Sequence, residues 1–227
     1  NNDKGENSAI ADKYKLVYDP KKAEALLDEI APKGGDGKRM YKGKPATIEI
    51  ITPSPVDGAE YIIGKLLKEE LSKLGVTASV RSLSGSVHDE KVERGNFDIT
   101  SNWVCNVSWD PQQLYSDLQS RYAQPVGKPA VGKNRTRMRD PKMDQLARQL
   151  ANLDPESPEA KPLLDQALEV YYQRLPVIPV IQTGYPSYFN TTFWTGWPTD
   201  DDLYQVPNNW WGQFMFVIGR LKPTGQK

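Results

Sequence analysis

The sequence predicts an α/β domain in which a mixed, mainly parallel sheet is flanked by helices. Three stretches rich in β-branched residues have the composition of strands: 47–52, 76–83 and 97–100. Between them, residues 57–75 and 86–95 show the apolar spacing of helices. A strand–helix–strand–helix–strand order is typical of layered α/β domains, because parallel neighbouring strands need a crossover connection.

A shorter helix is predicted ahead of the first strand. Asp19 can cap its first turn, and Pro20 suits the first helical position. Its apolar stripe consists of Ala23, Leu26, Leu27 and Ile30. Pro32 and the glycines after it end the helix, and a loop leads to the strand at 47–52. The polar residues 1–9 are predicted to be a linker or an exposed loop.

The second half of the chain is predicted to be mainly helical. Asp-Pro pairs at 110–111, 140–141 and 154–155 repeat the capping pattern of the first helix. The clearest amphipathic segments after them are residues 141–150 and 158–175.

The end of the chain differs in composition from the rest. Residues 176–182, PVIPVIQ, are predicted to form a buried strand. From residue 183 on, aromatic residues, prolines and asparagines dominate, with four of the six tryptophans and little helical period. We therefore expect an α/β lobe at 1–182 and an irregular, aromatic-rich extension with short strands at 183–227.

The composition argues against several classes of function. The 29 lysines and arginines balance 29 aspartates and glutamates, so no net field attracts nucleic acid or an anionic membrane. The basic cluster at 133–140 is predicted to be a solvated loop before a helix. Cys105 is the only cysteine, which excludes an internal disulfide. His88 is the only histidine, which argues against a histidine metal site and a Ser-His-Asp triad.

Motifs for catalysis or cofactor binding are absent from the sequence. It contains no GxGxxG, no P-loop and no nucleophile elbow. The consecutive carboxylates Asp200, Asp201 and Asp202 match no calcium loop and are predicted to be solvated. The longest apolar run, residues 177–181, is too short for a membrane span. The sequence thus predicts no catalytic residue, no metal ligand and no cofactor.

The strongest candidate for a binding site is NWVCNVSWDP, residues 102–111, directly after the strand-like FDIT. Open α/β sheets bind ligands at the carboxyl ends of their strands. Trp103 and Trp109 offer flat apolar faces with an N–H donor, and Asn102 and Asn106 offer amide donors and acceptors. Sugars, with C–H faces and hydroxyl rims, suit this mixture. The alternative for Trp103, that its indole closes the edge of the core, stays open.

The order of several segments is similar to that of a known family. In chain order these segments read YDPKKAEALLDE, DGKRMYKGKPATIEIIT, LSKLGVTASVRSL, VERGNFDIT and RLPVIPVIQ. From residue 18 to residue 227 the chain resembles the C-terminal part of the family 5 extracellular solute-binding proteins. These are the oligopeptide- and oligosaccharide-binding components of ABC importers.

The resemblance implies a two-lobed receptor, not an enzyme, that closes around its ligand by a hinge motion. Residues 1–182 would form the C-terminal lobe, of the periplasmic-binding-protein type II fold. Residues 183–227 would pack on the other lobe or, without it, on another copy of the chain. The implied partners are an oligosaccharide and an ABC permease, with no nucleic acid. The implied location is extracellular or periplasmic, with a lipid anchor on the full-length protein.

One position in the family separates peptide from sugar receptors. The peptide-binding branch carries an aspartate three residues after the tryptophan that follows the FD strand, and this carboxylate holds the amino terminus of the peptide. Asn106 stands at that position here. The segment NTTFWTGWPTDDDLYQVPNNWW resembles the branch that binds cello-oligosaccharides and related β-glycan oligosaccharides, and it adds Trp194 and Trp197 as ligand-binding candidates. The alternatives are an oligopeptide or nickel receptor of the same family, and a glycoside-active enzyme or its binding module.

Overall fold

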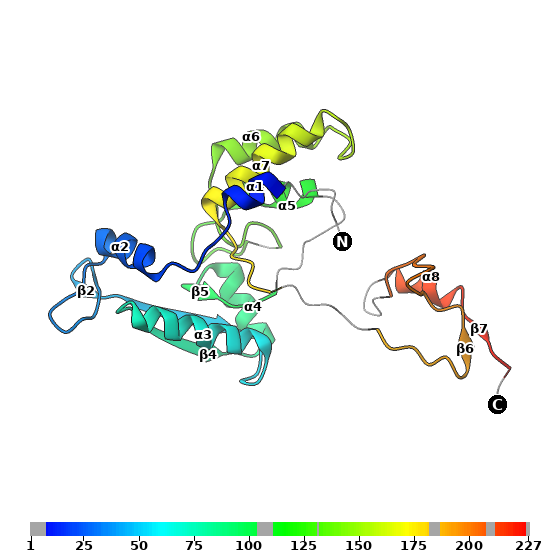
Figure 1. The fold of residues 1–227 in the computed structure, drawn as a ribbon, viewed down its shortest axis with the longest axis horizontal. Helices are drawn as coiled ribbons and strands as arrows, with labels where there is room; N and C mark the ends of the chain where they lie inside the picture. The colour runs from blue at the N-terminus through cyan, green and yellow to red at the C-terminus, as the bar shows by residue number, and fades with distance from the viewer. Residues whose placement is uncertain (1–7, 104–110, 131, 182–186, 208–211, 226–227) are drawn as a thin grey trace. The chain divides into compact units, whose positions relative to one another are not determined.

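The computed structural model divides into two compact units, residues 1–178 and 179–227 (Figure 1). The residues that it describes are 8–103, 111–130, 132–181, 187–207 and 212–225. The first unit holds a parallel sheet and all but one of the described α-helices, and the second holds a short strand pair and one helix. The roles that the sequence suggested for the two parts, as a lobe and a segment covering another lobe, stay predictions.

Three parallel strands form the sheet of the first unit, as the sequence predicted. β3 (Thr47–Thr52) lies between β4 (Thr77–Ser82) and β5 (Ile99–Thr100), and pairs with both in parallel. Ile50 and Ile51 of β3 are completely buried. The apolar run of the central strand therefore reflects burial on both of its faces.

Helices cover both faces of this sheet. Consecutive residues of a strand point to opposite faces, so Ile50 and Ile51 mark the two sides. α3 (Ala59–Lys73) packs on the Ile50 side, where a Cβ added at Gly64 would lie 3.3 Å from the Ile50 side chain. α4 (Gly85–Arg94) packs on the other side through His88, which contacts Thr100, the register partner of Ile51. Figure 1 shows α3 lying along the strands.

The predicted helix at the start of the chain is present as α2 (Pro20–Ile30). The Asp19 carboxylate accepts the Lys22 backbone N–H at 2.9 Å, which confirms the capping role. Its apolar stripe is only partly covered, since Ala23 and Leu27 are half-buried whereas Leu26 is 55% and Ile30 63% exposed. The loop predicted at residues 1–9 overlaps a helix at its end. α1 (Ser8–Lys13) begins within it, and residues 1–7 lie outside the described ranges.

A hairpin that the sequence did not predict precedes β3. β1 (Met40–Tyr41) and β2 (Lys44–Pro45) pair around a two-residue turn at Lys42 and Gly43. Both turn residues have positive φ, 49° and 75°, which is the signature of a type I′ turn. Because a lysine is unusual in the first of these positions, the sequence pattern indicates only a loop here.

The remaining helices of the first unit share one apolar core. They are α5 (Pro111–Asp117), α6 (Pro141–Leu150) and α7 (Ala160–Arg174), with a 3-10 turn at Ser120–Tyr122. α1 joins this group, as Figure 1 shows, by stacking Tyr14 on Tyr172 with ring centroids 5.8 Å apart. The buried side chains of this core are Tyr115, Leu118, Met138, Met143, Leu146, Leu150, Ala160, Leu164, Ala167 and Val170.

None of the described helices is both long and apolar enough to cross a membrane.

The basic segment 133–140 is not the solvated loop that the sequence suggested. Asn134 is buried, with its amide nitrogen 2.9–3.1 Å from the carbonyl oxygens of Leu118, Gln119 and Met138. Its amide oxygen accepts the Met138 backbone N–H at 2.9 Å. One buried amide therefore holds the segment against α5 and the 3-10 turn, a long-range contact that the charged composition conceals.

The predicted buried strand at 176–182 is also wrong for the residues that the structure describes. Residues 176–181 form no strand, and Ile178 is 63% exposed. Pro176 and Pro179 lack the backbone N–H that a sheet ladder requires. Gln182 lies outside the described ranges.

The second unit is largely irregular, as predicted. β6 (Trp194–Thr195) pairs antiparallel with β7 (Lys222–Pro223), and the short helix α8 (Phe214–Ile218) lies between them in the chain. The Phe189 and Trp197 rings stack with centroids 4.7 Å apart. The sequence does not predict the helix, because five residues are too few to show a helical period.

A valine at Gly64 should destabilise the first unit. The added side chain would press on Val80 and Ile50, whose nearest atoms lie 3.2 and 3.3 Å from the position that its Cβ would take. Overpacking of this kind costs about 1–3 kcal/mol, which should appear as a lower midpoint in urea unfolding. Gly35→Val is the matched control, since nothing lies within 4 Å of its Cβ position. Equal midpoints for the two variants would show that α3 does not pack closely on the sheet.

Asp140 should make the stability of the first unit depend on acid pH. Burial would raise the pKa of its carboxyl, but hydrogen bonds from the Met143 N–H, the Arg174 guanidinium and the Lys142 N–H outweigh burial and lower it. Because the folded pKa lies below the ordinary value of 3.8, the stabilisation is present above that value and is lost as pH falls through the folded pKa.

Asp140→Asn keeps a side chain that can cap α6 but removes the charge that pairs with Arg174. We expect this variant to unfold at lower urea concentration than the wild type at neutral pH, with the difference shrinking below pH 3.8. Asp154→Asn is the control, because Asp154 is exposed and caps only the turn at Glu156. A difference for Asp140→Asn that does not change with pH would contradict the assignment.

Candidate ligand-binding edge

The three parallel strands of the first unit end at one edge of the sheet. Their last residues are Thr52, Ser82 and Thr100. Numbered by chain order, the strands lie in the sheet in the order second–first–third. The crossover from β3 to β4 and the crossover from β4 to β5 therefore run in opposite directions across the sheet. A crevice opens at such a switch point, outside the carboxyl ends of the first and third strands. We call the residues at these strand ends the ligand edge: Thr52, Ser54, Ser82, Ser101, Asn102 and Trp103.

Serine hydroxyls connect the strand ends to each other and to α3. The Ser82 hydroxyl donates to the Ser54 carbonyl oxygen at 2.7 Å, which joins the ends of β4 and β3. The Ser101 hydroxyl donates to the Glu60 carbonyl oxygen at 2.7 Å, and the Ser54 hydroxyl bonds the Glu60 carboxylate. The ligand edge is therefore a hydrogen-bonded network anchored on the first turn of α3.

His88 supports this edge from the α4 side. The ring is completely buried, with Nε2 2.9 Å from the Thr100 hydroxyl and Nδ1 3.3 Å from the Asp89 carboxylate. Thr100 is the last strand residue before the segment that carries Asn102 and Trp103. His88 thus holds the end of β5 in place and occupies a structural position.

Asn102 and Trp103 lie together at the ligand edge, as the strand-end argument predicted. The Asn102 side-chain oxygen accepts the Trp103 backbone N–H at 2.7 Å, which fixes the turn of the chain. Trp103 is 51% exposed, and both its role in binding and the alternative that it closes the edge of the core stay predictions. Asn106 and Trp109 lie outside the described residues, as do Cys105 and Asp110.

Trp194 and Trp197 belong to the second unit. Trp194 lies in β6 and is 44% exposed. Trp197 is partly covered by Phe189, and its indole N–H donates to the Asn190 carbonyl oxygen at 3.2 Å. Their contribution to ligand binding stays a prediction. Asp200, Asp201 and Asp202 of the same unit are exposed, with Asp202 3.8 Å from Arg220.

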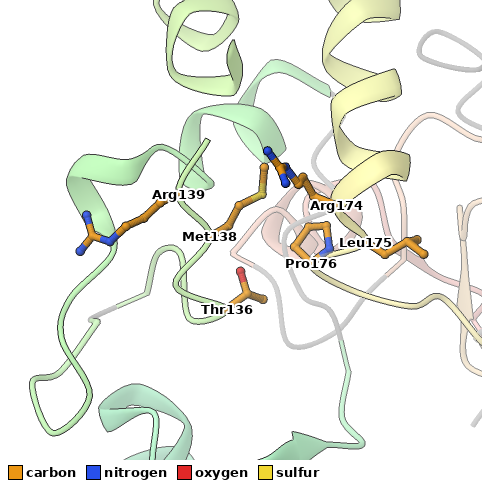
Figure 2. Close-up of a pocket in the computed structure, with 6 residues that line it drawn as sticks. All are labelled: Thr136, Met138, Arg139, Arg174, Leu175 and Pro176. Atoms are coloured by element: carbon orange, nitrogen blue, oxygen red, sulfur yellow. The ribbon is translucent and has the colours of Figure 1, made fainter. Parts of the chain in front are cut away.

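Two hollows of the surface lie elsewhere. One in the first unit has a volume of about 390 Å³ and is lined by Thr136, Met138, Arg139, Arg174, Leu175 and Pro176. Figure 2 shows the guanidinium groups of Arg139 and Arg174 pointing to different sides, so they form no clamp for an anion. The other, of about 440 Å³ in the second unit, includes Trp197 and an Arg220 guanidinium 4.0 Å from the Tyr204 ring centroid.

The hydroxyls of Ser54, Ser82 and Ser101 are candidate site groups that sequence reasoning missed, because it followed the aromatic residues. The available signal was a serine within two residues of the end of each predicted strand. The described residues include no cluster of three or more histidine, cysteine, aspartate or glutamate side chains able to hold a metal. The chemistry available at this edge is therefore stacking on an indole together with hydrogen bonding by hydroxyl and amide groups.

The sequence and fold both match proteins of known function. The family of bacterial extracellular solute-binding proteins, family 5, matches with its middle region over residues 2–124, more than half of the chain. The chain belongs to this family. Membership confirms the class of protein that the resemblance implied, a bacterial extracellular solute-binding protein.

Relatives of this family 5 protein differ in the ligands that their names state. Di/tripeptide-binding protein 4 of Pseudomonas aeruginosa is 27% identical over 190 residues, covering 82% of this chain and 31% of its own. A periplasmic oligopeptide-binding protein of Thermotoga maritima, crystallised with mannohexaose, is 24% identical with a TM-score of 0.78 over 99% of this chain and 42% of its own. NikZ of Campylobacter jejuni, in complex with Ni(L-His), is 25% identical with a TM-score of 0.58, over 70% and 31%.

These likenesses confirm the fold class, because the neighbours share the periplasmic-binding-protein arrangement of helices around a parallel sheet. The family 5 chain spans less than half the length of each of the three proteins that it matches. Family membership does not distinguish the branch that binds cello-oligosaccharides from the other branches of the family. The assignment to that branch therefore stays a prediction.

Replacing Thr100 by valine should destabilise the ligand edge. The variant keeps the shape of the side chain but removes the hydroxyl that bonds His88 Nε2, leaving a buried ring nitrogen without this partner. We expect a loss of about 1–3 kcal/mol in the free energy of unfolding, measured by urea titration. Thr100→Ser, which retains the hydroxyl, should lose clearly less. If Thr100→Val unfolds at the same urea concentration as the wild type, the hydrogen bond to His88 does not determine stability at this position.

Proposed function

We propose that this chain forms the C-terminal lobe of the substrate-binding component of an ABC importer and that it binds β-linked oligosaccharides. The ligand would lie between two lobes that close by a hinge motion, and the closed form would be delivered to a membrane permease. In this proposal residues 183–227 pack on the second lobe, and a lipid anchor holds the full-length protein outside the cytoplasm.

The observation that carries the ligand class is the exposed indole of Trp103 on an edge of hydroxyl and amide groups. A pyranose ring presents C–H groups that pack on an indole, and its hydroxyls need both donors and acceptors around the rim. Ser54, Ser82, Ser101 and Asn102 supply such groups at the same edge of the sheet. The Glu60 carboxylate next to them is bonded by the Ser54 hydroxyl.

A sugar ligand is compatible with the fold, since the Thermotoga maritima protein was crystallised with mannohexaose bound. The second candidate is a short peptide, favoured by the name of the Pseudomonas aeruginosa relative, a di/tripeptide-binding protein. A charged peptide amino terminus needs a carboxylate in a desolvated site. Asn106, at the position where the resemblance places that carboxylate, therefore favours the sugar.

Trp103→Ala should weaken oligosaccharide binding by the full-length protein. A stacking contact in a desolvated site contributes about 1–3 kcal/mol, so calorimetric titration with cello-, xylo- and manno-oligosaccharides should show a loss of about 5- to 150-fold. Tyr41→Ala is the matched control, because Tyr41 is similarly exposed at 49% but lies in the hairpin before the amino end of β3. The control should retain full affinity.

The same titrations distinguish the ligand classes. Tight binding of di- or tripeptides by the wild type, without sugar binding, would show that the oligosaccharide assignment is wrong. Full sugar affinity of Trp103→Ala combined with a lower unfolding midpoint would show that the indole serves packing. Asn106→Asp should not improve sugar binding, because an unpaired carboxylate in a closed site is costly.

A further inference from the structure

A stretch of strongly positive charge lies in a chain whose net charge is zero. Residues 118–139 contain six lysine and arginine side chains and no aspartate or glutamate. We call this stretch the basic loop; its cations are Arg121, Lys128, Lys133, Arg135, Arg137 and Arg139. Such an asymmetry creates a local field even where the whole chain is neutral.

The basic loop is held in a defined position against the C-terminal half of α4. The Gly127 N–H donates to the Arg94 carbonyl oxygen at 2.7 Å, and the Ala130 N–H donates to that of Glu93 at 2.8 Å. The Arg137 guanidinium also donates to the Glu93 carbonyl oxygen, at 2.6 Å. Together with the buried Asn134 amide, these bonds make the loop a fixed surface.

Most of the positive charge of the basic loop is not neutralised. Two of its cations have acidic partners: Lys133 lies 3.1 Å from Asp117, and Arg135 lies 3.3 Å from Glu93. Arg137 and Arg139 donate to backbone carbonyl oxygens, which carry no net charge. Across the described residues, no ion pair within 4.0 Å involves Arg121, Lys128, Arg137 or Arg139.

The basic loop lies away from the ligand edge. α4 starts at Gly85, just after the carboxyl end of β4, and ends at Arg94, before the amino end of β5. Because the loop bonds Glu93 and Arg94, it lies at the amino-terminal side of the sheet. The ligand edge and the cationic surface thus lie at opposite ends of α4.

We propose that the basic loop binds the anionic phospholipid headgroups of a membrane surface. Arg121, Lys128 and Arg139 are the exposed cations of the loop, and none of them forms an ion pair among the described residues. Each lysine or arginine near an anionic lipid surface contributes about 1 kcal/mol of attraction. Val126, 69% exposed between Pro125 and Gly127, adds an apolar side chain to the loop. Adsorption through this surface orients the ligand edge away from the lipid, and it does not depend on which solute the protein binds.

The test is cosedimentation of the purified chain with phospholipid vesicles. At low salt it should bind vesicles with about 30% phosphatidylglycerol but not pure phosphatidylcholine, and high salt should release it. Arg121→Gln combined with Lys128→Gln removes two exposed charges and should weaken binding about 25-fold, at roughly fivefold per cation. Lys65→Gln combined with Lys68→Gln, on α3, makes the same change of net charge outside the loop and should leave binding unchanged.

Three outcomes would overturn the proposal. Equal losses for the two double variants would show a response to net charge alone. Equal binding to both kinds of vesicle, or to neither, would exclude recognition of anionic lipid. A single-stranded oligonucleotide that binds at the same salt where vesicles do not would identify the basic loop as a nucleic-acid surface instead.

Discussion

The fold depends on one constraint, which is that β3 is paired on both sides and covered on both faces. Ile50 and Ile51 are completely buried because α3 lies on one face of the strand and α4 on the other. Since both neighbours run parallel to β3, all three strands must end at the same edge. The two crossovers run in opposite directions, and such a switch point is where open α/β sheets bind ligands. The position of the ligand edge is a geometric consequence of this arrangement.

Two buried polar side chains organise the parts of the first unit that have little regular structure. The Arg39 guanidinium is fully buried, lies 2.7 Å from the Asp28 carboxylate and donates to the Ala31 and Leu74 carbonyl oxygens. It thereby connects α2, the hairpin and the end of α3. Asn134 does the same for the basic loop. Removing either group would leave several carbonyl oxygens without partners, which is more costly than the net gain of any single hydrogen bond.

The two surfaces at opposite ends of α4 require different physical environments. The ligand edge consists of hydroxyls, an amide and an indole, which contribute most when water is excluded around a neutral solute. The basic loop carries charges that act over several ångströms and are screened by salt. α4 contacts both surfaces. His88 of this helix supports the end of β5, and the Glu93 carbonyl oxygen accepts a hydrogen bond that holds the basic loop.

Much of the fold could be predicted because local patterns encode it. The capping aspartates Asp19 and Asp140, the periodic stripe of α3 and the β-branched run of β3 report backbone preferences that act over a few residues. Their order along the chain was enough to predict a parallel sheet, and with it the strand end at which Asn102 and Trp103 lie. The family resemblance added the class of protein to this local information.

The tertiary structure decided which of these patterns are buried and which polar groups meet. The sequence could not show that the charged segment 133–140 is held by a buried amide, because Asn134 bonds carbonyl oxygens up to 16 residues away. It could not show that Ile178 is exposed, since the sequence of an apolar run is the same whether or not a neighbouring strand is available to pair with it. Nor could it bring Ser54, Ser82 and Ser101 to one edge. The sequence by itself determined the three strands of the parallel sheet, the longer helices and their order. The hairpin before β3, the burial of each element and the convergence of distant side chains depend on contacts that only the folded chain makes.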